Sequence, residues 1–158
     1  MAFDQPTALL RSRTMTRGDL IERALRGGFP EAVKRQPARR GAWFGSYVRT
    51  LGPLVETFVA TELLRQLSWS TNRATLFHFR DRSGIEVDLV LEPPDGRVVG
   101  IEVKATSTSR IDHLRGLRFL ADRLRDRFTY GYLLTTAPEA TPFGNKLAAL
   151  PISALWDI

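Results

Sequence analysis

Four charged residues alternate with branched apolar residues in the segment GIEVDLVLEPPDGRVVGIEVKAT, residues 84–106. They are Glu86, Asp88, Glu102 and Lys104. The alternation of branched apolar and charged positions predicts two β-strands. The letters PPDG between them predict a three-residue hairpin loop in which Gly96 takes the left-handed position. The segment is therefore expected to form a β-hairpin.

The loop fixes which side chains of the hairpin meet. With Pro93 opposite Arg97, Asp88 faces Glu102 and Glu86 faces Lys104. Because opposed residues share a face, one face should carry all four charges. The other face should be apolar, with Ile85, Val87, Leu89, Leu91, Val99, Ile101 and Val103.

The charged face suggests chemistry at a phosphate. Two carboxylates about 5 Å apart repel by roughly 3 kcal/mol at an effective dielectric constant of ~20. A protein tolerates this repulsion when a cation lies between them, and carboxylates with waters suit magnesium or manganese. Asp88 and Glu102 would bind the ion, with Glu56 from a preceding helix, while Lys104 orients water or steadies negative charge. This combination suits metal-assisted hydrolysis of a phosphodiester bond.

The elements that must hold these residues follow in order along the chain. GPLVETFVATELLRQL predicts a helix in which Glu56 and Glu62 point inward, and Glu62 is expected to be structural, pairing an arginine. TLFHFRD predicts a strand before the hairpin, RIDHLRGLRFLADRLRDR an amphipathic helix, and FTYGYLLTT and PISALW two further strands. The order helix-strand-strand-strand-helix-strand predicts an α/β (α+β) fold with a mixed sheet of about four to five strands flanked by helices.

The length of 158 residues favours one domain. We expect a flexible N-terminal arm at 1–17, a short helical arm at 18–50 and the main domain at 51–158. No cysteine is present, which excludes disulfides and thiolate chemistry. The sequence lacks a long apolar run, so we expect a soluble, cytoplasmic protein with no membrane partner.

The charge predicts an anionic partner. The net charge is +6, and nucleic acid is the commonest partner of a basic domain. Arg115, Arg118 and Arg125 on the outer side of their helix are candidate contacts to a DNA backbone, or else form an ordinary solvated surface.

The spacing of the acids resembles that of a known superfamily. The pattern E…D-X13-E-V-K, formed by Glu56, Asp88 and the triplet 102–104, is similar to the PD-(D/E)XK nucleases. That resemblance implies a restriction-endonuclease-like core and magnesium or manganese as cofactor. It also implies that Glu56, Asp88, Glu102 and the carbonyl of Val103 are metal ligands, and that Lys104 is catalytic.

A second resemblance covers most of the chain. The segments GGFPEAVKR, WFGSYVRT, LVETFVATELLRQ, LFHFRDRSGIEVDLVLE, IEVKAT and LPISALW are similar to the domain of unknown function that follows the ATPase module in prokaryotic AAA-type ATPases. No G-X-X-X-X-G-K-[ST] loop is present, so ATP is not expected as a ligand. A segment that resembles a winged helix separates SYVRT from LGPLVETF in those proteins, and here the two are abutted.

Two functions follow from the sequence. The first is a magnesium-dependent nuclease acting on DNA. The second is a non-catalytic module that binds nucleic acid or protein, and a homodimer through the surface exposed by the missing segment is a third arrangement.

Overall fold

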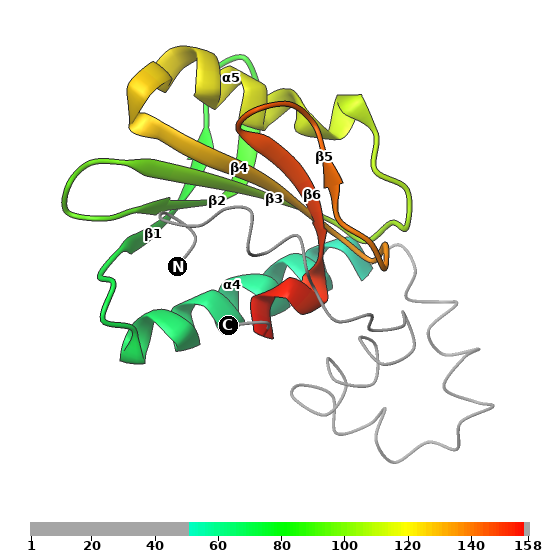
Figure 1. Ribbon diagram of the computed structural model, residues 1–158, viewed down its shortest axis with the longest axis horizontal. Coiled ribbons are helices and arrows are strands. Elements are labelled where there is room, and N and C mark those ends of the chain that lie inside the picture. Colours follow the sequence, from blue (N-terminus) through cyan, green and yellow to red (C-terminus); the bar gives the residue numbers. More distant parts are fainter. Residues whose placement is uncertain (1–50, 157–158) are drawn as a thin grey trace.

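The computed structural model describes residues 51–156 of the chain. The arms expected at 1–17 and 18–50 lie outside the described residues. Figure 1 shows how the described elements are arranged. In chain order they are α4 (Leu51–Trp69), β1 (Thr75–Arg80), β2 (Glu86–Glu92), β3 (Val98–Lys104), η2 (Ile111–Leu114), α5 (Arg115–Leu124), η3 (Arg125–Arg127), β4 (Phe128–Thr135), β5 (Thr141–Pro142), β6 (Leu147–Pro151) and η4 (Ile152–Trp156).

The strands form one open mixed sheet of six strands in the order β1-β2-β3-β4-β6-β5. β1, β2 and β3 are antiparallel neighbours, whereas β3, β4 and β6 run parallel. The crossover from β3 to β4 passes through α5, because parallel neighbours need a long connection. The domain is therefore a mixed α+β fold, with more strands than the four to five expected.

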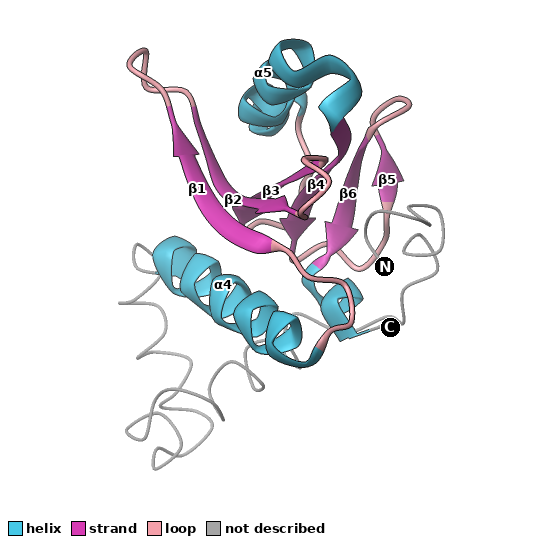
Figure 2. Ribbon diagram, turned by 90° about the vertical axis from the view of Figure 1, so that its left-hand side faces the viewer, coloured by secondary structure: helices cyan, strands magenta, loops and turns pink. Residues whose placement is uncertain are grey.

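Within residues 51–156, the helices α4 and α5 lie on opposite faces of the sheet (Figure 2). Val55, Val59 and Leu63 of α4 pack against one face, together with the apolar residues of η4. Leu114, Leu117 and Leu120 of η2 and α5 pack against the other face. Burial of these apolar side chains on both faces supplies the main driving force for folding.

The β2–β3 hairpin has the predicted register. Leu89 pairs with Ile101, Val90 with Gly100, and Leu91 with Val99. In the loop the Gly96 N–H donates to the Pro93 carbonyl at 3.0 Å, and Gly96 has a φ of +77°. The structure thus confirms the three-residue loop and the position expected for its glycine.

One expectation about a strand is wrong, and one strand was not expected. PISALW was expected to be a strand, but Ile152–Trp156 forms the 3-10 helix η4 and the last strand is Leu147–Pro151. A short apolar run does not by itself distinguish a strand from a buried helical turn. The short strand β5 had not been expected, since its two residues, Thr141 and Pro142, carry no strand pattern.

None of the helices within residues 51–156 combines the length and the hydropathy needed to cross a membrane.

Candidate functional site

Asp88, Glu102 and Lys104 meet where β3 ends, as the hairpin register predicted. The Lys104 ammonium lies 2.8 Å from Glu102 Oε1 and 3.5 Å from Asp88 Oδ2. One lysine therefore bridges the two carboxylates. The side chain of Asp88 is 12% exposed and that of Glu102 is 9% exposed, so water screens little of this interaction.

A β-bulge in β2 determines how Asp88 is presented. Phe77 pairs with Val90 and Phe79 pairs with Val87, so Asp88 and Leu89 together lie opposite the single residue His78. A bulge of this kind kinks the strand and turns a side chain to a new direction. It also explains why Val87 does not join Leu89 on the α4 face, as was expected, but packs under α5.

Hydrogen bonds hold the bulge in place. The Val103 N–H donates to Asp88 Oδ2 at 2.7 Å, so this carboxylate takes the place of a backbone acceptor beyond the last paired residues of β2 and β3. His78 Nδ1 lies 3.1 Å from the Asp88 carbonyl and acts as the donor in this bond. His78 is thus a hydrogen-bonded residue of the bulge. Asp88 is fixed by its backbone and by its side chain at once.

Glu102 carries the one buried charged atom of the described residues that has no partner. Its Oε1 is bound to Lys104, whereas its Oε2 is buried and has no hydrogen bond of normal length and angle. The backbone N–H of Asp88 still lowers the pKa of this carboxyl slightly. Two other buried atoms have no partner, His113 Nδ1 and the Tyr132 hydroxyl oxygen. Neither a histidine ring nor a tyrosine hydroxyl has to carry a charge. A buried carboxylate oxygen left without a partner costs several times more than a neutral one, because charge is expensive to desolvate.

The electrostatics of the site follow from its burial. Burial raises the pKa of the Glu102 carboxyl, the Lys104 hydrogen bond opposes this shift, and the negative charge of Asp88 adds to it. Burial alone would lower the pKa of the Lys104 ammonium, but the hydrogen bond and charge of Glu102 outweigh it and the pKa is raised. Lys104 is therefore held as a cation between two acids.

The charges of Asp88 and Lys104 affect the pKa of Glu56, but Glu56 makes no hydrogen bond or ion pair with either of them. Burial raises the pKa of Glu56, and the charge of Asp88 raises it further while Lys104 lowers it. No three acidic or histidine side chains among residues 51–156 are close enough to form a ready-made metal cage. Asp88 and Glu102, which share Lys104, are therefore the candidate pair of ligands, and Glu56 of α4 interacts with Asp88 through its charge.

Glu86 does not pair with Lys104, which had been one expectation from the register. It lies 3.8 Å from Arg80 on β1, and both side chains are at least half exposed. Lys104 is occupied by the two acids on its own side of the hairpin. Glu62, in contrast, is hydrogen-bonded to Arg65, as its expected structural role requires.

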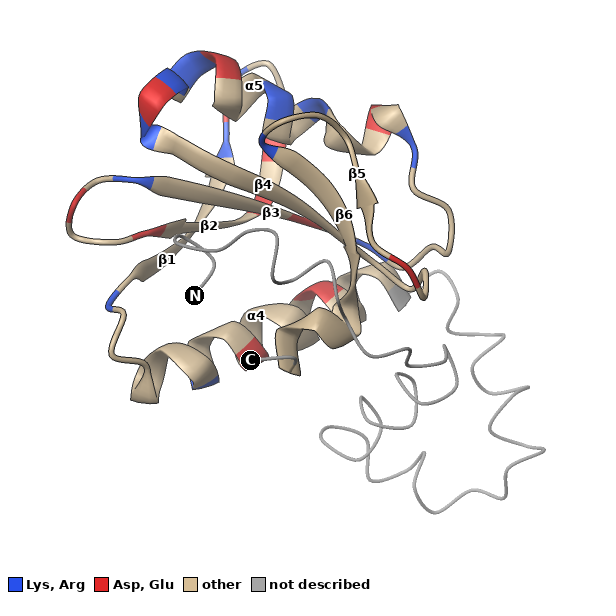
Figure 3. Cartoon of the chain, in the orientation of Figure 1, with Lys and Arg blue, Asp and Glu red and all other residues tan. Residues whose placement is uncertain are grey.

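The three arginines expected to contact DNA lie at different distances from the cluster. Arg115 precedes Gly116, whose backbone lies against the Glu86 carbonyl at the start of β2, so Arg115 lies towards the site. Arg118 is one turn further along α5. Arg125 begins η3 at the opposite end of α5, two residues before Arg127, which binds the Gly96 carbonyl of the hairpin loop. Figure 3 shows blue segments along α5, with red segments among them.

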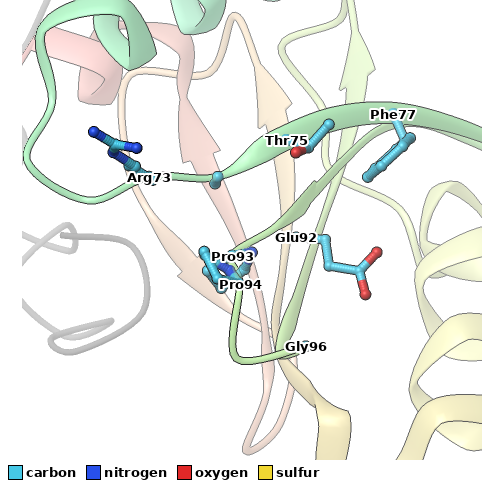
Figure 4. Close-up of a pocket in the computed structure, with 8 residues that line it drawn as sticks. Arg73, Thr75, Phe77, Glu92, Pro93, Pro94 and Gly96 are labelled. Atoms are coloured by element: carbon cyan, nitrogen blue, oxygen red, sulfur yellow. The ribbon is translucent and has the colours of Figure 1, made fainter.

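One further group of residues was missed by the sequence reasoning. A pocket of about 460 Å³ lies at the other end of the hairpin and is lined by Arg73, Ala74, Thr75, Phe77, Glu92, Pro93, Pro94 and Gly96 (Figure 4). Phe77 on β1 was the only signal for this pocket in the sequence. Its exposure, which draws attention to it in the structure, cannot be read from the residue type alone.

Fold and site define a mixed α+β domain in which one buried acid, one largely buried acid and a lysine lie together on its central strands. The family model described as "Domain of unknown function (DUF4143)" matches residues 51–155. The chain belongs to the DUF4143 family. Neither a curated protein nor a solved structure shows a significant match to the chain.

Proposed function

We propose that this domain is a metal-dependent nuclease-like domain that hydrolyses phosphodiester bonds of DNA, on a core of the restriction-endonuclease type. The observation that carries the proposal is the buried, unpartnered Glu102 Oε2 beside Asp88 and Lys104. A buried charged oxygen without a partner destabilises the fold. Such groups persist where a bound ion or substrate completes them.

The donor set fits magnesium or manganese. Mg²⁺ is usually bound by one or two carboxylates and completes its shell with waters and substrate phosphate oxygens. Asp88 and Glu102 supply these carboxylates, and the Val103 carbonyl stays a proposed ligand. When bound, such an ion polarises a phosphoryl oxygen and makes a water more acidic. Glu56, which makes no direct contact with the pair, is proposed to hold a water of the site.

The remaining roles belong to the chain itself. Lys104 is a fixed cation within 3.5 Å of both carboxylates, so it can stabilise negative charge that develops on a phosphate. The Val103 N–H and the bulge at Asp88 orient the carboxylate before substrate arrives. Arg115 and Arg118 are proposed to contact the DNA backbone near the site. Arg125 would contact it further away.

A second function is favoured by a different observation. Lys104 already compensates both acids, and no group of three potential metal ligands occurs in residues 51–156. These facts suit a non-catalytic module that binds nucleic acid or protein through its basic surface. Such a module would bind DNA equally well with EDTA and after Asp88→Asn.

The test is a cleavage assay on single-stranded, linear duplex and supercoiled DNA, with Mg²⁺, Mn²⁺ or EDTA. The parent protein should cut with either metal and not with EDTA, and Lys104→Ala should lower the rate about 100-fold or more. Arg82→Ala is a matched control, because it also removes one positive charge but lies in an exposed turn. Cleavage by Lys104→Ala at the parental rate would contradict the nuclease function.

A further inference from the structure

The pocket at the turn end of the hairpin lies on an open edge of the sheet. β1 is the first strand in the sheet order, so one of its sides has no neighbouring strand within the described residues. Thr75 and Phe77 on β1 form one wall, and Pro93 and Pro94 of the hairpin loop form another (Figure 4). A volume of about 460 Å³ lies within the range of small-ligand sites, roughly 300–1,000 Å³.

The pocket is held in shape from outside. Arg127 of η3 donates from Nε to the Gly96 carbonyl at 2.8 Å, and its Nη2 lies 2.8 Å from Glu92 Oε1. Both partners line the pocket, so one arginine fixes the loop and the adjacent carboxylate together. The ion pair with Arg127 also neutralises the charge of Glu92. The pocket is thus preformed and carries no uncompensated negative charge on its described lining.

Arg73 gives the pocket a net positive charge. Its guanidinium makes no hydrogen bond or ion pair with any residue in the range 51–156, and the residue is exposed. Phe77 is 48% exposed, which is unusual for a large apolar side chain on a strand. Figure 4 shows Arg73 at one end of the pocket, Phe77 at the other, and the two proline rings between them. This arrangement suits a ligand with a flat apolar body and an anionic group some distance from it.

We infer that this pocket binds one nucleotide unit of single-stranded DNA, with the base stacked on Phe77 and a phosphate at Arg73. Aromatic rings stack on bases of any sequence, and the base must be unpaired to be stacked in this way. The chain's net charge of +6 favours the same polyanion. The inference deepens the proposed function, on which it rests for the identity of the ligand, by naming the single-stranded form as substrate.

The position relative to the acidic cluster agrees with this role. Glu92 at the pocket and Asp88 at the cluster are four residues apart on β2. At ~3.3 Å per residue they are about 13 Å apart along the strand, a distance within reach of a short oligonucleotide. The two sites are therefore separate, and each can be altered without changing the other.

The experiment measures binding of a fluorescein-labelled dT12 oligonucleotide by anisotropy in EDTA, so that no cleavage occurs. Phe77→Ala should weaken binding about five-fold or more, the range expected for one stacked base. Arg73→Ala should weaken it and reduce the salt dependence by about one phosphate contact. Trp69→Ala removes another exposed aromatic side chain and should change binding less than two-fold. Arg82→Ala is the control for the loss of one positive charge and should change binding only through that charge.

Equal binding by Phe77→Ala and the parent would overturn the inference, because charge alone would then explain retention. Equal loss in Phe77→Ala and Trp69→Ala would overturn it as well. If Phe77→Ala binds DNA normally and Lys104→Ala has lost cleavage, the DNA-binding role of the pocket is refuted and the nuclease function stands. If Phe77→Ala weakens binding but the parent protein does not cut DNA under any condition, the DNA-binding role of the pocket is supported and the nuclease function is refuted.

Discussion

The described residues contain two buried glutamates whose surroundings differ. Glu62 on α4 is fully paired: Arg65 binds both of its oxygens, and Gln66 also donates to Oε1 at 2.9 Å. Glu102 on β3 has one paired oxygen and one that is buried without a partner. Both are less than a tenth exposed. The same residue type is therefore completed by the chain in one region and left incomplete in the other.

The difference indicates that the surroundings of Glu102, and not those of Glu62, are the functional region. Arg65 and Gln66 lie on the same helix turn as Glu62, so pairing there is local and stabilises the fold. The paired oxygen of Glu102 binds Lys104, which also lies 3.5 Å from Asp88 of β2, so a second acid is held close to Glu102. A fold retains such repulsion only where another interaction gains from it.

The largest expected effect separates the two glutamates by activity. Glu102→Gln should lower the proposed metal-dependent cleavage about 100-fold or more, because it removes a proposed charged ligand of the ion. The same change should alter the free energy of unfolding by less than about 1 kcal/mol, since the lost ion pair is offset by relief of burial and repulsion. Glu62→Gln should cleave at the parental rate. Comparable cleavage by Glu102→Gln and Glu62→Gln would remove the distinction.

The next effect concerns the lysine between the acids. Lys104→Met leaves Asp88 and Glu102 without their cation, which should lower the free energy of unfolding by about 2 kcal/mol in EDTA. The value is at the low end for buried pairs, because Lys104 is 34% exposed. Mg²⁺ should restore more stability to Lys104→Met than to the parent, as followed by urea unfolding. A loss that Mg²⁺ does not restore would make the cluster a structural ion pair only.

A smaller effect tests how α5 positions the start of β2. A Cβ atom at Gly116 would lie 2.1 Å from the Glu86 carbonyl oxygen, so Gly116→Ala must move the helix or the strand. The expected loss is between about 1 and 2 kcal/mol, with weaker cleavage because Asp88 follows on the same strand. Gly52→Ala is the control, since nothing lies within 4 Å of its added carbon. Unchanged unfolding of Gly116→Ala would show that the helix is not fixed there.

The smallest effect is a pH dependence at Glu62. The Arg65 hydrogen bond holds the pKa of Glu62 below its ordinary value, although burial opposes it. A lowered folded-state pKa stabilises the protein above the unfolded value near 4.5 and loses this contribution as the pH falls through the folded pKa. The stability difference between the parent and Glu62→Gln should therefore be below about 1 kcal/mol at pH 7 and shrink below pH ~4. A difference that grows on acidification would contradict the sign.

The hairpin shows what sequence can predict. The letters PPDG specify a local loop, and the loop alone determines which residues oppose one another, so the meeting of Asp88, Glu102 and Lys104 followed directly. The same reasoning placed Val87 on the wrong face. The bulge at Asp88 arises from pairing with β1, a distant contact that the alternation of residues does not contain.

Other features depended on packing between elements. The strand Leu147–Pro151 is buried along its whole length and has no alternation, so its bounds were not visible in the sequence. The separation of Glu56 from the acidic pair is determined by how α4 docks on the sheet. The helix face could be predicted from its periodicity, whereas this distance could not.

The most direct test of the central claim is the binding of Mn²⁺, measured by electron paramagnetic resonance, to the parent, Glu102→Gln and Glu62→Gln proteins. The claim is that Glu102 is left incomplete because a divalent cation completes it. The parent and Glu62→Gln should each bind Mn²⁺ at one site, and Glu102→Gln should bind it at least about ten-fold more weakly. Equal Mn²⁺ binding by all three proteins, or no binding by the parent, would contradict the claim.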